Sequence, residues 1–172
     1  ASAEMVTEQL YDEPIEVLMA ANHPLTKYTL VPLDALTCYP HVIFKDGYGM
    51  QRLVQDLFSR QSGTFNASLE LNSLDAFRGV VRQGNLISLL PRSALVEALN
   101  DPTLAVRPIA ATPSENGSSR KQTLTRQVVL VTTQDRLQIP PIRSFYNLVL
   151  ELMPTCHSSV QETVGITPAI AP

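Results

Sequence analysis

Cysteine, glycine and histidine are scarce in this chain of 172 residues. The two cysteines, Cys38 and Cys156, lie far apart, and neither they nor the three histidines have the spacing of a metal site. Phosphate-binding loops, dinucleotide glycine motifs and Gly-x-Ser-x-Gly elbows are also missing. We therefore expect free thiols, no metal, no cofactor and no enzyme activity.

Long hydrophobic runs and a strong charge of one sign are missing as well. No apolar run approaches the roughly 20 residues that span a bilayer, and no basic segment followed by an apolar core indicates a signal peptide. We expect no membrane association and a cytoplasmic location. The net charge of −3 gives no reason to expect that this chain itself binds DNA.

The clearest positive pattern covers 69–91, which predicts a strand end, a helix and a second strand. Ser73 is placed to cap the helix through its hydroxyl, and Gly84 to end it in a left-handed conformation. Leu86, Ile87, Leu89 and Leu90 form a nearly continuous apolar run, which is typical of a strand covered on both faces. The apolar face of the helix is formed by Leu74, Phe77, Val80 and Val81.

The rest of the chain continues this alternation of strands and helices. Ile15, Val17 and Met19 share one face of an extended segment at 10–20, and Asp12 and Glu13 at its start are interpreted as solvated charges. Helices are predicted at 50–58, 94–99 and 139–152, and strands at 41–45, 65–71, 104–109 and 123–132. The order predicts an α/β fold with a mostly parallel sheet and helices on both faces.

Four segments in this order resemble the effector-binding domain of LysR-type transcriptional regulators. They are His23-Pro24-Leu25, Val42-Ile43-Phe44, Ser73–Val81 leading to Leu89-Leu90-Pro91, and Val128–Val131 followed by the helix that ends at Leu152. The resemblance implies a type II periplasmic-binding-protein-like module with two lobes. It also implies that the first lobe is incomplete here and that the N-terminal DNA-binding helix-turn-helix is absent from this chain.

On this resemblance the chain divides into five parts. Residues 1–20 would be a lead-in and hinge strand, and 21–110 the second lobe. Residues 111–122 would be a mobile loop, because they are rich in Ser, Thr, Asn and Gly. Residues 123–153 would return a strand and a helix to the first lobe, and 154–172 would be a flexible tail.

The best candidate for ligand contact is the segment Lys45–Met50, with Asp46, Gly47, Tyr48 and Gly49 between. It joins a buried strand to a helix, so free backbone N–H groups, two glycines and a lysine would face a ligand. Spacing alone favours a plain surface turn, whereas the resemblance favours an effector site. Asn72 and Ser73 are secondary candidates for the same site.

The resemblance implies a sensor that binds a small metabolite between two lobes, and the metabolite is expected to be a carboxylate. Its binding would alter DNA binding and transcription. The alternative is a substrate-binding lobe of a transporter component or of an enzyme with the same architecture. A homo-oligomer, dimer or tetramer, is implied. We also expect self-association of this chain, because the strand Val128–Val131 is too apolar for a free edge.

Overall fold

The computed structural model describes residues 4–45, 49–59, 66–110 and 123–153. The chain forms two compact units. The central unit is Asp12–Gln127, and the terminal unit combines Ala1–Tyr11 with Val128–Pro172. The predicted mobile loop at 111–122 and the predicted tail at 154–172 lie outside the described residues.

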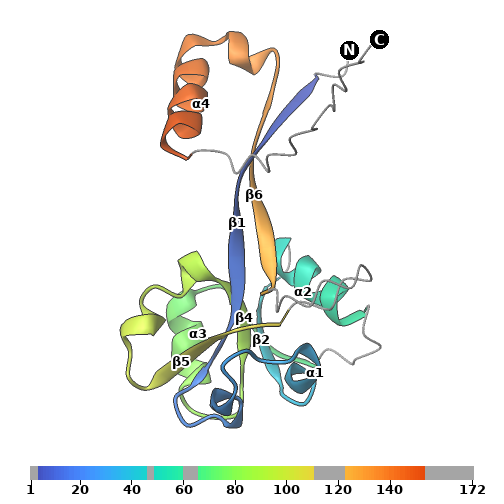
Figure 1. The fold of residues 1–172 in the computed structure, drawn as a ribbon, viewed down its shortest axis with the longest axis vertical. Helices are drawn as coiled ribbons and strands as arrows, with labels where there is room; N and C mark the ends of the chain where they lie inside the picture. The colour runs from blue at the N-terminus through green and yellow to red at the C-terminus, as the bar shows by residue number, and fades with distance from the viewer. Residues whose placement is uncertain (1–3, 46–48, 60–65, 111–122, 154–172) are drawn as a thin grey trace, which may run out of the picture. The chain divides into compact units, whose positions relative to one another are not determined.

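The observed elements follow the predicted alternation (Figure 1). In chain order they are β1 (Met5–Ala20), α1 (Leu33–Leu36), β2 (His41–Phe44), α2 (Gly49–Ser59), β3 (Ala67–Leu71), α3 (Leu74–Val81), β4 (Ser88–Pro91), β5 (Leu104–Pro108), β6 (Thr125–Thr133) and α4 (Pro140–Leu152). Short 3₁₀ turns occur at Pro24–Lys27, Arg92–Ala94, Ala98–Asn100 and Arg136–Gln138.

Strand pairing in the central unit is mixed. β2 and β3 are parallel, with Phe44 opposite Leu71, and an isolated parallel bridge joins His41 to Ile87. β1 lies between β4 and β5 and runs antiparallel to both, which differs from the mostly parallel sheet predicted. Apolar patterning specifies that a segment is a strand but not its direction, so this reversal could not be predicted.

Two hydrophobic clusters occupy the central unit, and β1 contributes to both because its side chains alternate between faces. Ile15, Val17 and Met19 belong to the first cluster, which α1 and α2 cover. Leu18 belongs to the second, with Phe77 and Val81 of α3. Helices therefore pack against both faces of the strands, as the sequence predicts.

Three local predictions need correction. Ser73 does occupy the N-cap of α3, but its side chain makes no capping hydrogen bond; its carbonyl oxygen accepts from the Phe77 amide at 3.1 Å. Gly84 has no left-handed backbone, because α3 already ends at Val81 and Arg82 keeps a helical conformation. The predicted helix at 94–99 is replaced by two 3₁₀ turns, Arg92–Ala94 and Ala98–Asn100, because the backbone leaves the helical region at Leu95, where φ is −105° and ψ is 0°.

The terminal unit contains α4 and the outer parts of β1 and β6. Tyr146 of α4 donates a hydrogen bond to Glu8 of β1 at 3.0 Å, and the Gln134 amide donates to the Glu4 carbonyl at 3.0 Å. No residue of α4 is buried, and Phe145 is 62% exposed. The helical spacing of Phe145 and Leu152 favours a buried apolar face, but both side chains are exposed in this chain. Within the described residues, no helix is long and apolar enough to cross a membrane.

Candidate functional site

The predicted ligand segments follow two neighbouring strands. β2 leads into Lys45, β3 leads into Asn72, and the Lys45 amide donates to the Leu71 carbonyl oxygen at 2.9 Å. Because β2 and β3 are parallel, both segments emerge at the same edge of the strands, where α/β folds commonly bind ligands. Lys45, Asn72 and Ser73 are all exposed there.

The segment after β2 enters α2, whose first residues are Gly49 and Met50. Gly49 is exposed, and a Cβ added to it would meet no heavy atom of the described residues within 4 Å. Met50 is buried, with 7% of its surface exposed. Asp46, Gly47 and Tyr48, also predicted to contact a ligand, lie outside the described residues.

A cavity of about 460 Å³ opens beside the start of α2. This volume is within the range of small-molecule sites. Its described lining residues come from β2, α2, α3, β4, the following turn and β6: Phe44, Gly49, Met50, Leu53, Leu74, Pro91, Ala94, Arg126 and Gln127. Two predicted residues, Gly49 and Met50, thus line the cavity, whereas Lys45, Asn72 and Ser73 are not among its described lining residues.

Arg126 is the only charged side chain among the described lining residues, and sequence reasoning missed it. Its Nη2 lies 2.7 Å and its Nε 2.9 Å from Glu13 Oε2, while Glu13 Oε1 accepts from the Ser93 amide at 2.8 Å. The side chain of Glu13 is only 6% exposed. The interpretation of Glu13 as a solvated charge is therefore wrong, because it lies in an inter-strand ion pair.

Burial raises the pKa of the Glu13 carboxyl, but the hydrogen bonds from Ser93 and Arg126 lower it by more, so its pKa lies below the usual value. Glu13 is thus a carboxylate at neutral pH. A signal for its burial was available: Glu13 has the same strand parity as Ile15 and Val17, which were predicted to face inward. The spacing along the sequence did not indicate its partner, Arg126, which is 113 residues away.

A second ion pair joins β1 to the turn after β4. Glu16 Oε1 accepts from Arg92 Nη1 at 2.8 Å, and the Glu16 side chain is 6% exposed. Arg92 is more exposed, at 54%, and is not among the described residues that line the cavity. The two pairs have similar chemistry, but only Arg126 lies at the cavity.

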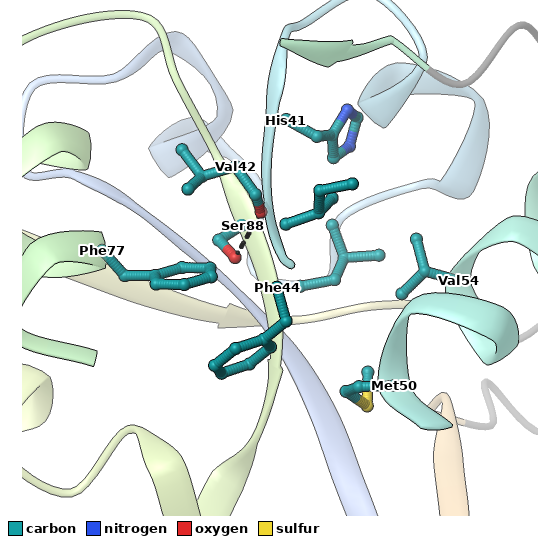
Figure 2. A pocket seen from close by; sticks show the side chains of 9 residues that line it. His41, Val42, Phe44, Met50, Val54, Phe77 and Ser88 are labelled. Carbon is teal, nitrogen blue, oxygen red and sulfur yellow. Dashed lines mark hydrogen bonds between the residues drawn. The ribbon is translucent and has the colours of Figure 1, made fainter. Parts of the chain in front are cut away.

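A much smaller void lies inside the central unit, between β2, α2, α3 and β4 (Figure 2). Its volume is about 10 Å³, which is room for one water and not for a metabolite. Ser88 Oγ donates to the Val42 carbonyl oxygen at 2.9 Å beside it, as the dashed line in Figure 2 shows. Burial lowers the pKa of His41, which lines this void, to about 4. His41 is therefore a neutral core residue near pH 7.

Among the residues that the structure describes, histidine and acidic side chains do not gather into a metal site. His23 caps the turn Pro24–Lys27, where its Nδ1 accepts from the Leu25 amide at 3.2 Å, as expected of a turn residue. Across the described ranges, no group of three His, Cys, Asp or Glu side chains could hold a metal ion. The described lining of the cavity is therefore mainly apolar, with one cation, Arg126, that is held by Glu13.

Residues 1–154 match the family described as LysR substrate binding domain, and the chain belongs to that family. It is 43% identical over 152 residues to a probable nitrogen assimilation transcriptional activator of Synechococcus elongatus, which covers 88% of this chain and 46% of that protein. A protein of the same name from Synechocystis sp. is 46% identical over 148 residues, or 86% of this chain and 47% of that protein. The chain spans about half the length of these relatives.

Solved structures show the same fold. The regulatory domain of Synechocystis CcmR, in complex with 2-PG, matches with a TM-score of 0.72 at 20% identity, over 90% of this chain and 70% of that one. The effector binding domain of QuiR, in complex with shikimate, matches with a TM-score of 0.69 at 22% identity, over 87% of this chain and 66% of that one. The periplasmic-binding-protein-like fold predicted from the sequence is confirmed.

Proposed function

We propose that the chain senses a small metabolite for a LysR-type transcriptional regulator and that the metabolite binds in the cavity of the central unit. The observation that carries the proposal is a 460 Å³ hollow at the ends of parallel strands, in a chain of this family. The names of the relatives as transcriptional activators support it. The domains of CcmR and QuiR, which share the fold, were solved with small molecules bound.

The proposed role is binding without chemical change. The described lining offers one guanidinium, one carboxamide and mainly apolar walls, and therefore no acid–base pair. Lys45, Asn72 and Ser73 would reach the ligand from the rim of the cavity. A ligand that binds one arrangement of the domain better than another would shift the population of arrangements.

In the complete protein we propose that this shift alters DNA binding by a separate N-terminal helix-turn-helix, within a homo-oligomer in the cytoplasm. A transporter or enzyme role finds no support in the described lining, and the curated relatives are named as transcriptional activators. The effector would be a small metabolite that fits the cavity volume.

A thermal-shift screen of metabolites on the complete protein tests the proposal. A ligand at 100 times its dissociation constant should stabilise the protein by about 2.7 kcal/mol. When a hit is added, the amide signals of the protein at Gly49, Met50 and Gln127 should shift, and those of the turn at Ala98–Asn100, which is not among the described lining residues, should shift less. A hit whose shifts avoid the cavity would contradict this location, and a complete protein that binds no DNA would contradict the regulatory role.

A further inference from the structure

The walls of the cavity are apolar except at one side. Phe44, Leu53 and Leu74 contribute hydrocarbon surface, and Arg126 and Gln127 of β6 contribute the polar groups among the described lining residues. The Arg126 side chain is 33% exposed, and the apolar walls beside it bring the effective dielectric constant below that of water, so its guanidinium interacts more strongly with a ligand charge than a fully solvated one would. The kind of polar group that the ligand carries therefore depends on which N–H donors of Arg126 remain available to it.

Arg126 has N–H donors that Glu13 does not use. Its Nε and Nη2 both point to Glu13 Oε2. Its Nη1 has only the Met50 sulfur, at 4.0 Å, as a partner among the described residues. Thioether sulfur is a weak acceptor, so a ligand oxygen would replace it readily. Met50 also lines the cavity, so the contact from Nη1 joins two of its lining residues.

Glu13 holds this guanidinium in place. It contacts Arg126 through one oxygen and the Ser93 amide through the other, so β1, β6 and the turn after β4 are joined at one carboxylate. The carboxylate is nearly buried, and a buried ion pair of this geometry restricts the rotamers of the arginine before any ligand arrives.

We propose that Arg126 is the specificity-determining residue of the cavity, selecting a ligand that carries an anionic group on a compact apolar body, and that Glu13 is its positioning residue. The inference rests on the proposed function of the cavity. The start of α2 at Gly49 lies in the same lining and adds backbone N–H groups that favour negative charge. Glu13 acts on the ligand through Arg126.

The alternative is that Arg126 serves only to neutralise a buried carboxylate. Arg92 provides the internal comparison, because it also forms an ion pair with a buried carboxylate of β1, Glu16, through one nitrogen rather than two, and it is not among the described residues that line the cavity. Arg92→Gln is therefore a matched control for Arg126→Gln. Both variants remove a cation from a buried carboxylate of β1, and only one of them removes a cation from the cavity.

The first experiment measures the affinity of the complete protein for benzoate and for benzamide, which have the same shape and differ in charge, by protein-detected NMR titration. Benzoate should bind at least about tenfold more tightly, as expected for a charge-assisted hydrogen bond. Arg126→Gln should bring the ratio of the benzoate affinity to the benzamide affinity close to one. Arg126→Lys should lower this ratio only in part, and Arg92→Gln should leave the ratio unchanged. The double variant Glu13→Gln/Arg126→Gln removes both charges and replaces Arg126→Gln if that variant does not fold.

If Arg126→Gln or the double variant still binds benzoate as much more tightly than benzamide as the unchanged protein does, the assignment of Arg126 is overturned, and the proposed function is not affected. Equal affinity of the unchanged protein for the two probes would do the same. Binding of neither probe up to millimolar concentration, together with no metabolite hit at the cavity, would overturn both proposals.

The positioning role of Glu13 requires a double-mutant cycle. Glu13→Gln should change the benzoate affinity by about threefold or more when Arg126 is present and by clearly less in the Arg126→Gln background, because contacting residues show coupled effects. An equal effect in both backgrounds would mean that Glu13 acts on the ligand directly, and no effect in either would mean that it does not act. Each of these results would overturn the positioning role.

Discussion

Both the central unit and the terminal unit contain amphipathic helices, but only in the central unit are the apolar faces of these helices buried. Phe77 of α3 has no exposed surface, whereas Phe145 of α4 is 62% exposed. The exposed large apolar residues of the terminal unit also include Val129 and Val131 of β6 and Leu148 and Leu152 of α4. The comparison teaches that helical periodicity identifies an apolar face but does not say whether the chain covers it.

The largest expected difference lies between the two phenylalanines. Phe77→Ala should lower the free energy of unfolding by about 3–5 kcal/mol, because it removes a fully buried ring from the core. Phe145→Ala is the matched control and should change it by less than about 0.5 kcal/mol, as exposed substitutions usually do. Urea titration followed by circular dichroism measures both, and similar losses for the two variants would break the comparison.

The core of the central unit should also be sensitive to acid, because it holds a neutral histidine. The pKa of His41 is lowered to about 4, chiefly by burial, from a usual value near 6.5. Between these values the unfolded state binds a proton that the folded state does not, so stability falls as the pH falls. The expected loss from pH 6.5 to 4 is of the order of 2–3 kcal/mol.

The control is His41→Gln, which cannot titrate and should flatten this part of the pH profile. Glu13 affects stability at a lower pH than His41. Because folding lowers the pKa of Glu13, its contribution to stability is complete above about pH 5 and is lost as the pH falls through the pKa of the folded state. A profile for His41→Gln that remains as steep as that of the unchanged chain would show that His41 is not the titrating group.

The exposed face of the terminal unit should make the chain self-associate. Apolar patches of this kind favour association, and symmetric pairing is the commonest form. Phe145→Asp should weaken the association by about tenfold or more, since it places a charge in an apolar contact. Val96→Asp alters a comparably exposed residue of the central unit, at 59%, and should leave association unchanged. Sedimentation velocity of the 172-residue chain at several micromolar concentrations measures the association. The mass of a monomer at every concentration would contradict the expectation.

The same comparison explains which features could be predicted from the sequence. Period-2 and period-3.6 patterns located β1, α2 and α3 because the central unit buries those faces, and Gly49 and Met50 were found because a strand-to-helix loop is a local feature. Arg126 was missed because its role depends on Glu13, and an arginine in an alternating strand looks solvated from its neighbours alone. The antiparallel direction of β1 and the end of α3 before Gly84 depend on tertiary contacts that no local pattern specifies.

The smallest expected change in stability concerns Gly49, where the central unit is open rather than packed. Gly49→Val adds a side chain into space with no heavy atom within 4 Å of its Cβ, so the free energy of unfolding should change by less than about 1 kcal/mol. The same side chain should weaken the binding of a cavity ligand by about tenfold, because it fills part of the hollow that Gly49 lines. Gly84→Val is the matched control: Gly84 is also exposed with open space at its Cβ, and it is not among the described lining residues. Calorimetric titration with a hit from the thermal-shift screen compares the two, and equal affinities would place the ligand away from the start of α2.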